Sequence, residues 1–567
     1  MPATTLRSPK AASTSHHKKP PEPSRPWLIA LRSVFAFDEP VEGRDFTFEP
    51  GRFGVAPSWQ VLRQHANDEE LRRLQTGLCE MAVLDLFVIG GYGVVVLVLG
   101  ILAGGPSESD TDYFLAGRRE GWAPVAASTW ATKLSALTFI GVPGAAIAGN
   151  FAYAQLWIGS FLAAYLVAAI FIPEFYRLRV STVYEYLGHR IGPQTRTGGT
   201  IIFIISRCLA SAVRLAGCAI AVSVFFEIAL VDAILLIAGI AAAYVLTGGL
   251  RAVIWTDVLQ LLLFLTGAIA AIAYVSVTLP GGVAQIVETG AAADKFRVFD
   301  FSFDLADPTT FWMGNLFALI LGLATGGTDQ DIAQRALACP NARQSRIALV
   351  TAGAADLIST PLFLSAGAAV FAYYDAFPRD AVAKLMAENR YDYIFPYFIL
   401  HELPAGLRGV LVAALLAAAM SSLDSALSGL SSSAYFDLGL TRRGRLKSVL
   451  QGPRILVVVF AIVLAGIAIG FGSQPSILWF GLQIMGYTYG GLLGLFLVAC
   501  CLHRFADDLA SLVAALSSIV VVVILTKWGI GFGFAPIPWP WAVVIGASWT
   551  CILVLIAATL RQLRQNL

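Results

Sequence analysis

The 567-residue sequence has little charge: Asp, Glu, Lys and Arg make up 13% of it, against 57% hydrophobic residues. Soluble domains carry about 25% charged residues, so this composition argues against a soluble protein. Apolar runs of about twenty residues, each long enough to cross a bilayer, follow one another from about residue 82 to residue 560. The chain is therefore expected to be an all-α polytopic membrane protein.

Several motifs of other functional classes are also missing. The seven cysteines form no CxxC pair, which argues against a disulfide framework and against structural zinc. No HExxH and no Walker sequence GxxxxGK[ST] occurs, so the sequence supports neither a zinc protease nor an ATP-driven pump. No basic stretch has the interleaved aromatic residues of a nucleic-acid groove. We therefore expect that the protein is not an enzyme and that it binds neither a cofactor nor nucleic acid. The sequence leaves the oligomeric state open.

The positions of charge, glycine and proline divide the apolar part of the chain into about thirteen spans. Lys and Arg concentrate in alternate loops, one of which holds Arg335, Arg343 and Arg346. Such loops face the cytoplasm, which predicts a multi-pass protein of the plasma (inner) membrane with a cytoplasmic C-terminus. The predicted spans are 82–104, 121–148, 151–176, 197–226, 230–248, 252–279, 310–334, 345–373, 404–436, 453–472, 476–501, 508–528 and 538–560.

Residues 1–80 do not fit this pattern. They are rich in Pro, Ser, His and Lys, and in the predicted topology they would have to cross the membrane with no signal peptide ahead of them. We expect residues 1–80 to be a disordered or non-native N-terminal extension, with Met81 as an alternative start, and residues 81–567 to form one membrane domain.

The segment "AALLAAAMSSLDSALSGLSSS" (413–433) places Asp424 in an apolar helix beside Ser421, Ser422 and Ser425. Ser421, Asp424 and Ser425 share one helix face. Oxygen ligands suit a hard cation such as sodium, and a carboxylate at membrane depth is a candidate functional group. Serines can also bond back to the helix backbone or pack as small residues, which is our interpretation for the serines at 428–433.

Two further segments combine polar residues with helix-breaking ones. In "ASTWATKLSALTFIGVPG" (127–144), Lys133 and Ser135 precede a Gly-x-x-Gly-like stretch with Pro143, where we expect the helix to break. "YVLTGGLRAVIWTDVLQ" (244–260) places Asp257 about two turns inside a helix. Transporters build ion and substrate sites at helices broken at mid-membrane.

Five stretches, "DYFLAGRR" (112–119), "SALTFIG" (135–141), "GGLRAVIWTDVLQ" (248–260), "TDQDIAQRALA" (328–338) and "AALLAAAMSSLDSAL" (413–427), together resemble the sodium:solute symporter family. The resemblance implies a leucine-transporter-like fold with two inverted five-helix repeats, at 121–279 and 310–501, one helix ahead of them and two behind at 508–560. It implies a secondary active transporter in which sodium drives symport of a small organic solute by alternating access.

The resemblance also implies a sodium site made of the backbone carbonyls of Ala131, Leu134 and Ala418 and the hydroxyls of Ser421 and Ser422. Some members of the family bind a second ion nearer the cytoplasm.

The matching second site would be Asp257, Asp424 and Ser425, with a carboxylate where the family has a serine. Two interpretations of Asp424 stay open: it binds a cation or carries a proton, or it forms a structural ion pair with Lys133 or an arginine.

The substrate is expected to be an organic anion such as a carboxylate, because positive side chains gather where the family binds solute and because Trp157 cannot replace the acidic group of sugar-carrying members. We expect Arg207 to extend toward the cytoplasm and Arg214, which lies deeper, to meet a carboxylate. The candidate substrate residues are Lys133, Ser135, Thr138, Trp157, Ser160 and Arg214.

Two alternatives stay open. Lys133 could take the place of the ion and leave a proton-coupled or sodium-independent transporter. The chain could also be a non-transporting solute sensor, which would be expected to carry an appended signalling domain.

Overall fold

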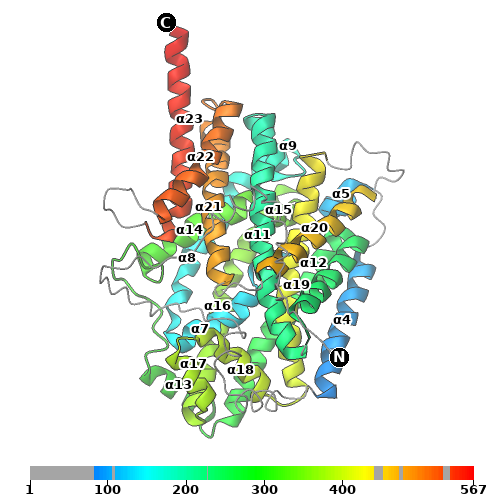
Figure 1. Ribbon diagram of the computed structural model, residues 1–567, viewed down its shortest axis with the longest axis vertical. Coiled ribbons are helices and arrows are strands. Elements are labelled where there is room, and N and C mark those ends of the chain that lie inside the picture. The colour runs from blue at the N-terminus through cyan, green and yellow to red at the C-terminus, as the bar shows by residue number, and fades with distance from the viewer. Residues whose placement is uncertain are drawn as a thin grey trace, which may run out of the picture. The chain divides into compact units, whose positions relative to one another are not determined.

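The computed structural model describes residues 82–104, 109–226, 228–439, 451–471, 477–527 and 537–566, and every regular element in these ranges is a helix (Figure 1). The all-α polytopic fold expected from hydropathy is confirmed. The expected extension over residues 1–80 lies outside the described residues.

The helices in chain order are α4 (Val83–Gly104), α5 (Asp110–Leu115), η1 (Ala116–Arg118), α6 (Trp122–Lys133), α7 (Ala136–Ala148), η2 (Phe151–Leu156), α8 (Trp157–Leu166), η3 (Val167–Phe171), α9 (Ile172–Leu178), α10 (Val183–Arg190), α11 (Pro193–Phe226), α12 (Leu230–Thr278), α13 (Gly282–Ala292), α14 (Phe311–Thr328), α15 (Gln330–Leu337), α16 (Ala342–Ala376), α17 (Asp380–Ala387), η4 (Tyr391–Tyr393), α18 (Ile394–His401), α19 (Leu407–Phe436), α20 (Gln451–Phe471), α21 (Ile477–Leu497), η5 (Val498–Leu502), α22 (Asp508–Lys527), η6 (Trp539–Trp541) and α23 (Ala542–Asn566). Of the η elements, η3 and η5 are π-helices and the others are 3-10 helices.

Within the described ranges, 11 helices are long and apolar enough to cross a membrane, or up to 12 if the bent pair α6 and α7 counts as one span. The sequence predicted about thirteen. The difference lies in α12, which counts as a single helix of 49 residues although its backbone breaks at Gly249. A straight helix of that length would reach about 74 Å at 1.5 Å per residue, more than twice the hydrocarbon core. The break therefore separates two spans, as the predicted runs 230–248 and 252–279 require.

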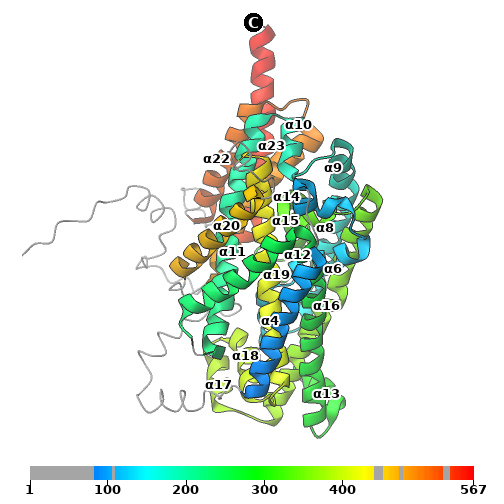
Figure 2. The same cartoon turned by 90° about the vertical axis from the view of Figure 1, so that its right-hand side faces the viewer.

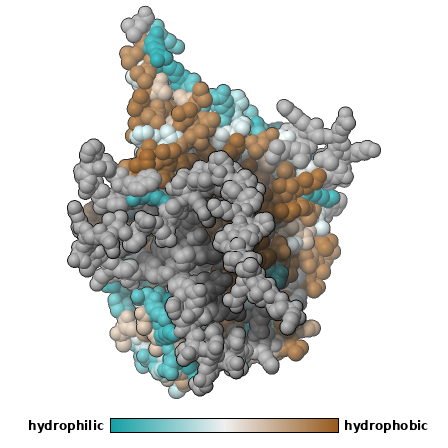
Figure 3. Space-filling view, viewed as in Figure 1, coloured by the Kyte–Doolittle hydropathy of each residue, from teal (hydrophilic) through white to brown (hydrophobic). Residues whose placement is uncertain are grey.

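Large apolar side chains on the outer helices point away from the protein. Phe87 and Leu102 of α4 are 77% and 75% exposed, and Val520 of α22 is 59% exposed. Brown hydrophobic residues cover much of the described surface in Figure 3, and teal hydrophilic ones gather toward its lower end and near its top. Exposed apolar area on this scale would be unfavourable in water, so these faces fit contact with lipid.

The centre of the bundle is α19, whose span is 89% buried. It packs against α12, α11, α4 and α20, and its inner part also contacts α6 and α15 (Figure 2). Small residues allow this close approach: a Cβ added to Gly429 would lie 3.1 Å from Asp331 of α15. The serines and Asp424 singled out in the sequence therefore lie in the interior and not toward lipid.

Two helices that contact this core are broken. The chain bends by 58° between α6 and α7, where Leu134 has an extended backbone (φ −78°, ψ 128°). Between α14 and α15, Asp329 is extended in the same way (φ −81°, ψ 125°). The last carbonyls of a helix have no partner within it, so those at each break need a partner from elsewhere. The sequence predicted a break within 127–144 at the Gly-x-x-Gly-like stretch that contains Pro143, and that position is wrong, because α7 continues through Pro143 and the break lies at Leu134.

Gly249→Ala tests the break in α12. Gly249 has φ +58° and ψ −150°, a conformation essentially limited to glycine, and an added Cβ would lie 2.4 Å from the Tyr113 carbonyl oxygen. We expect the variant to lose roughly 1–3 kcal/mol of stability, measured as a lower unfolding temperature of the purified protein. Gly239→Ala is the matched control, because it lies in the same helix with nothing within 4 Å. Equal melting of the two variants would contradict the assignment.

Candidate ion and solute site

The predicted sodium ligands meet where α6 ends against α19 and the second half of α12. Ala131, Leu134, Ala418 and Ser421 line one small internal cavity together with Gln260 of α12. Ser422 lies one position further along α19, where its hydroxyl donates to the Ala418 carbonyl at 3.4 Å. The cavity is thus bordered by the broken end of one helix and by the hydroxyl-bearing face of another. Backbone carbonyl and hydroxyl oxygens are the ligands that a hard monovalent cation prefers.

Asp257 orients one of these ligands. Ser421 donates from Oγ to Asp257 Oδ1 at 2.7 Å, and Asp257 is fully buried. A hydroxyl that donates its proton keeps its lone pairs for other partners. The Ser421 oxygen is therefore available to a cation in the cavity while its hydrogen is held by Asp257.

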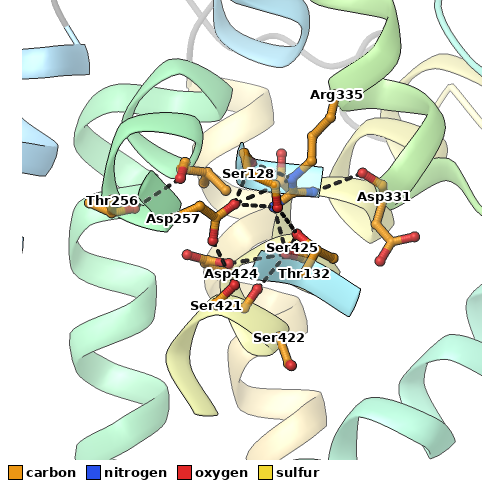
Figure 4. A network of polar contacts seen from close by, with 12 residues as sticks. Ser128, Thr132, Thr256, Asp257, Asp331, Arg335, Ser421, Ser422, Asp424 and Ser425 are labelled. Atoms are coloured by element: carbon orange, nitrogen blue, oxygen red, sulfur yellow. Dashed lines mark hydrogen bonds and ion pairs between the residues drawn. The ribbon is translucent and has the colours of Figure 1, made fainter. Parts of the chain in front are cut away.

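The other oxygen of Asp257 is bound by Arg335, as Figure 4 shows. Arg335 Nη2 lies 2.9 Å from Asp257 Oδ2, and Ser128 donates to the same oxygen at 2.5 Å. The guanidinium also donates to Ser128 Oγ at 2.8 Å, to Ser425 Oγ at 2.6 Å and to the Asp331 carbonyl at 2.8 Å. One arginine of α15 thus joins α6, α12 and α19.

Arg335 was expected in a loop, and this expectation is wrong: it lies within α15 and its side chain is 0% exposed. Neither Arg335 nor Ser128 was expected at the site. One signal was available in the sequence, because a carboxylate as deep as Asp257 needs a partner of opposite charge. The spacing alone could not show which arginine would supply it.

Asp424 is also fully buried. It accepts from the Tyr244 hydroxyl at 2.6 Å and contacts Ser425 Oγ at 3.2 Å. Within the described residues it forms no ion pair, either with Lys133 or with an arginine. The structure therefore brings Asp257, Asp424 and Ser425 together, with one guanidinium beside them.

Lys133 is paired elsewhere. Its ammonium group forms an ion pair with Asp356 of α16, and the Ser160 hydroxyl lies 3.4 Å from the same carboxylate. Lys133 is 27% exposed and is not among the residues that line the small cavity. Its charge is largely balanced by Asp356.

The other candidate substrate residues surround the start of α7 and the start of α8. Ser135 and Thr138 form the capping box of α7, with the Ser135 backbone N–H donating to Thr138 Oγ1 at 3.3 Å. Trp157 stacks on Phe161 with ring centroids 5.4 Å apart, and its indole N–H is buried without a partner in the described protein. A buried donor of this kind is available to a ligand.

The two arginines of α11 differ in their surroundings. Arg207 is 3% exposed and pairs with Asp331 and, at 3.4 Å, with Asp329. It does not extend to the cytoplasm, and that expectation is wrong because α15 supplies two carboxylates inside the protein. Arg214, two turns deeper, is partly exposed and makes no hydrogen bond or ion pair with any described residue. α11 packs against both α7 and α19.

One end of the site is closed by α15. Asp329, Gln330, Asp331, Gln334 and Arg335 are each at most 1% exposed. Their partners lie on several other elements: the Tyr489 hydroxyl donates to Asp329 at 2.6 Å, and Gln334 donates to the Phe114 carbonyl at 2.5 Å. Hydrogen bonds and ion pairs therefore hold α15 against several other elements of the bundle.

The model of the sodium:solute symporter family matches residues 113–524, which include every site residue described above. The chain belongs to this family. It is 29% identical to the sodium/sialic acid symporter SiaT of Proteus mirabilis (strain HI4320) over 78% of the chain and 90% of SiaT. It is 27% identical to the human sodium-coupled monocarboxylate transporter 1 over 78% of the chain and 73% of that protein.

The fold also matches a solved member of the family. A structure of a Na⁺-coupled sialic acid symporter, in a substrate-bound outward-open state, superimposes with a TM-score of 0.74 and 26% identity, covering 84% of this chain and 98% of the other. The leucine-transporter-like fold expected from the five sequence stretches is confirmed. As a symporter of this family, the protein is a multi-pass membrane transporter and not an enzyme, and sodium is the family's coupling ion.

The ion pair between Arg335 and Asp257 can be tested by single and double substitution. Removing one partner of a buried pair leaves an uncompensated charge, so Arg335→Gln and Asp257→Asn should each lose about 3–5 kcal/mol of stability, and the double variant should recover part of it. Unfolding temperatures of the purified proteins measure both effects.

The exposed pair of Arg561 and Asp507, with side chains 44% and 41% exposed, is the matched control. Arg561→Gln should lose less than about 1 kcal/mol. Direct pairing would be contradicted if the double variant at the buried pair lost as much stability as the two single variants lose together.

Proposed function

We propose that the protein uses the inward sodium gradient to accumulate a small organic anion by alternating access. The observation that carries this proposal is that four candidate sodium ligands from two helices border one cavity, with Asp257 holding the proton of Ser421. The chemistry of the proposed site is that of a cation held by neutral oxygens. Its charge would be offset by the nearby acidic groups.

We propose Ala131, Leu134 and Ala418 as carbonyl ligands and Ser421 and Ser422 as hydroxyl ligands of this sodium ion. The broken end of α6 supports the first two, because carbonyls in the last turn have no helical donor. Sodium bound by both α6 and α19 would add a link between two helices that Arg335 already joins through Ser128 and Ser425. Ion binding can thereby favour one state of the transporter over another.

A second cation position at Asp257, Asp424 and Ser425 is a further part of the proposal. Two carboxyl groups there favour a cation, but the Arg335 guanidinium already lies within hydrogen-bonding distance of Asp257 and Ser425. An added ion would have to share Asp257 with that positive charge. We therefore propose that this position binds sodium more weakly than the first one.

For the solute we propose a carboxylate-bearing organic anion. Arg214 supports this, because its guanidinium lacks a partner in the described protein and a bidentate contact to a carboxylate would satisfy it. Lys133, Ser135, Thr138, Trp157 and Ser160 are proposed as the remaining solute contacts. The named relatives, which carry sialic acid and monocarboxylates, agree with an anionic substrate.

Alternating access would move the two proposed five-helix repeats, 121–279 and 310–501, relative to each other. The two helices at 508–560 lie outside these repeats. The buried polar contacts of α15 would hold one end closed and would have to break when that end opens. By the distribution of Lys and Arg we propose that this end faces the cytoplasm, as does the C-terminus, in a plasma (inner) membrane.

Proton coupling is a second candidate. It is favoured by one observation, the buried Asp424 that forms no ion pair in the described part of the chain. The version in which Lys133 replaces sodium has less support, because Lys133 pairs with Asp356.

Ser421→Ala tests sodium coupling. Loss of one hydroxyl ligand should weaken sodium activation of uptake by roughly tenfold or more, measured in proteoliposomes with an inward sodium gradient. Ser431→Ala, whose buried hydroxyl on the same helix has no partner, should behave as the parent. Uptake by the parent that survives replacement of sodium by choline and follows a pH gradient would instead favour proton coupling.

Arg214→Gln tests the anionic substrate. With labelled sialic acid, monocarboxylates and neutral sugars as a panel, we expect the variant to lose uptake of the anion by roughly 10- to 100-fold, since a charged hydrogen bond contributes about 1.5–3 kcal/mol. Arg214→Lys should retain part of it. Sodium-induced thermal stabilisation should be unchanged, because Arg214 lies outside the proposed ion site. Anion uptake equal to that of the parent would disprove this role.

A further inference from the structure

A second cavity lies outside the transport site, between η3 with the end of α8 and the first turns of α16. It is an open groove of about 330 Å³. Tyr165 and Ala169 line one wall, and Arg343, Arg346, Ile347 and Val350 line the other. The family's coupling ion and solute, as proposed above, do not use any of these residues.

A close contact between α8 and α16 lies next to the groove. A Cβ added to Gly353 of α16 would lie 2.6 Å from the Cβ of Ala164 of α8, so the helices touch there. After α8 the chain continues as the π-helix η3. The alanines Ala168 and Ala169 of η3 line the groove. α8 and α16 lie side by side in Figures 1 and 2.

The residues from α16 form one continuous stripe. Arg343, Arg346, Ile347 and Val350 are spaced at i, i+3, i+4 and i+7, which places them on the same face of the helix. Seven residues correspond to about 10 Å along the axis. The stripe therefore begins with two cations and ends in apolar side chains.

Both arginines are free to bind a ligand. Arg343 and Arg346 are exposed, and neither makes an ion pair or hydrogen bond with any residue that the structure describes. Ile347 is 39% exposed and Tyr165 is 50% exposed. The apolar face continues along α16 with Leu357 and Ile358, which are 53% and 63% exposed.

We propose that this groove is a binding site for an anionic phospholipid. The phosphate of the headgroup would bridge Arg343 and Arg346, and an acyl chain would follow Ile347 and Val350 toward the lipid-facing part of α16. Basic pockets between transmembrane helices bind anionic headgroups in this way. An inorganic anion would use the arginines but would leave the apolar floor of the groove uncovered, and that floor therefore favours a lipid.

Such a lipid would contact the helix pair that also holds the Lys133 ion pair. The Ser160 hydroxyl of α8 lies 3.4 Å from the Asp356 carboxylate of α16, about one helical turn beyond the contact of Ala164 with Gly353. A lipid bound between the same two helices would hold them at a fixed separation. The lipid site is independent of the identity of the transported solute.

The test measures the binding of defined lipids to the purified full-length protein by native mass spectrometry. The probes are dioleoyl phosphatidylglycerol, dioleoyl phosphatidylcholine and inorganic phosphate. The parent should retain phosphatidylglycerol in preference to both other probes. In the double variant Arg343→Gln with Arg346→Gln, the affinity for phosphatidylglycerol should fall roughly thirtyfold, as expected for the loss of two interfacial cations.

Arg504→Gln with Arg564→Gln removes the same charge outside the groove and should bind phosphatidylglycerol as the parent does. Ala169→Phe keeps both arginines but fills the groove, and it should also lose the tightly bound lipid, so it decides the question if the arginine variant does not fold. Parent-like lipid binding by Arg343→Gln with Arg346→Gln, or retention of inorganic phosphate as tight as that of the lipid, would overturn the proposal.

Discussion

The ion pair between Arg335 and Asp257 is the interaction on which the central site depends. Both side chains are fully buried, and a buried charge without its partner is strongly unfavourable. The pair fixes α15 against α6, α12 and α19 through Ser128 and Ser425. It also leaves Asp257 as an acceptor for Ser421. A single guanidinium thus sets both the closure of one end of the bundle and the orientation of a proposed sodium ligand.

The breaks at Leu134 and Asp329 make this arrangement possible. A continuous helix would satisfy its own carbonyls, whereas a broken one leaves them inside the protein, where only a cation or a donor can satisfy them. At the end of α6, Ala131 and Leu134 line the small cavity. At the start of α15 the break turns Arg335 and the two aspartates at 329 and 331 into the core. The same backbone feature therefore provides proposed ion ligands at one break and closing contacts at the other.

Three cations around the central site are balanced by carboxylates. Lys133 pairs with Asp356, Arg207 with Asp331 and Arg335 with Asp257. Against these pairs Arg214 stands out, because it lies in the interior of the bundle without a partner among the described residues. The selectivity of the proposed solute site for anions would follow from this one uncompensated cation, and not from the total number of basic residues.

The sequence by itself determined the membrane-spanning helices, the presence of a break within 127–144 and the grouping of Ser421, Asp424 and Ser425 on one face, because hydropathy, helix-breaking residues and helical periodicity are local properties. It did not determine the position of that break, which lies at Leu134 and not around Pro143. It also determined the family, through five short stretches in order.

Only the tertiary structure decided the partners. Arg335 looked like a loop cation and Arg207 like an interfacial one, since the position of a side chain along the chain does not show which carboxylate folds against it. Pairing of charges depends on contacts between helices that are distant in sequence. Asp257 and Arg335, for example, are separated by 78 residues. The depth and charge of Asp257 predict that it needs a cationic partner. Only the fold determines that this partner is Arg335.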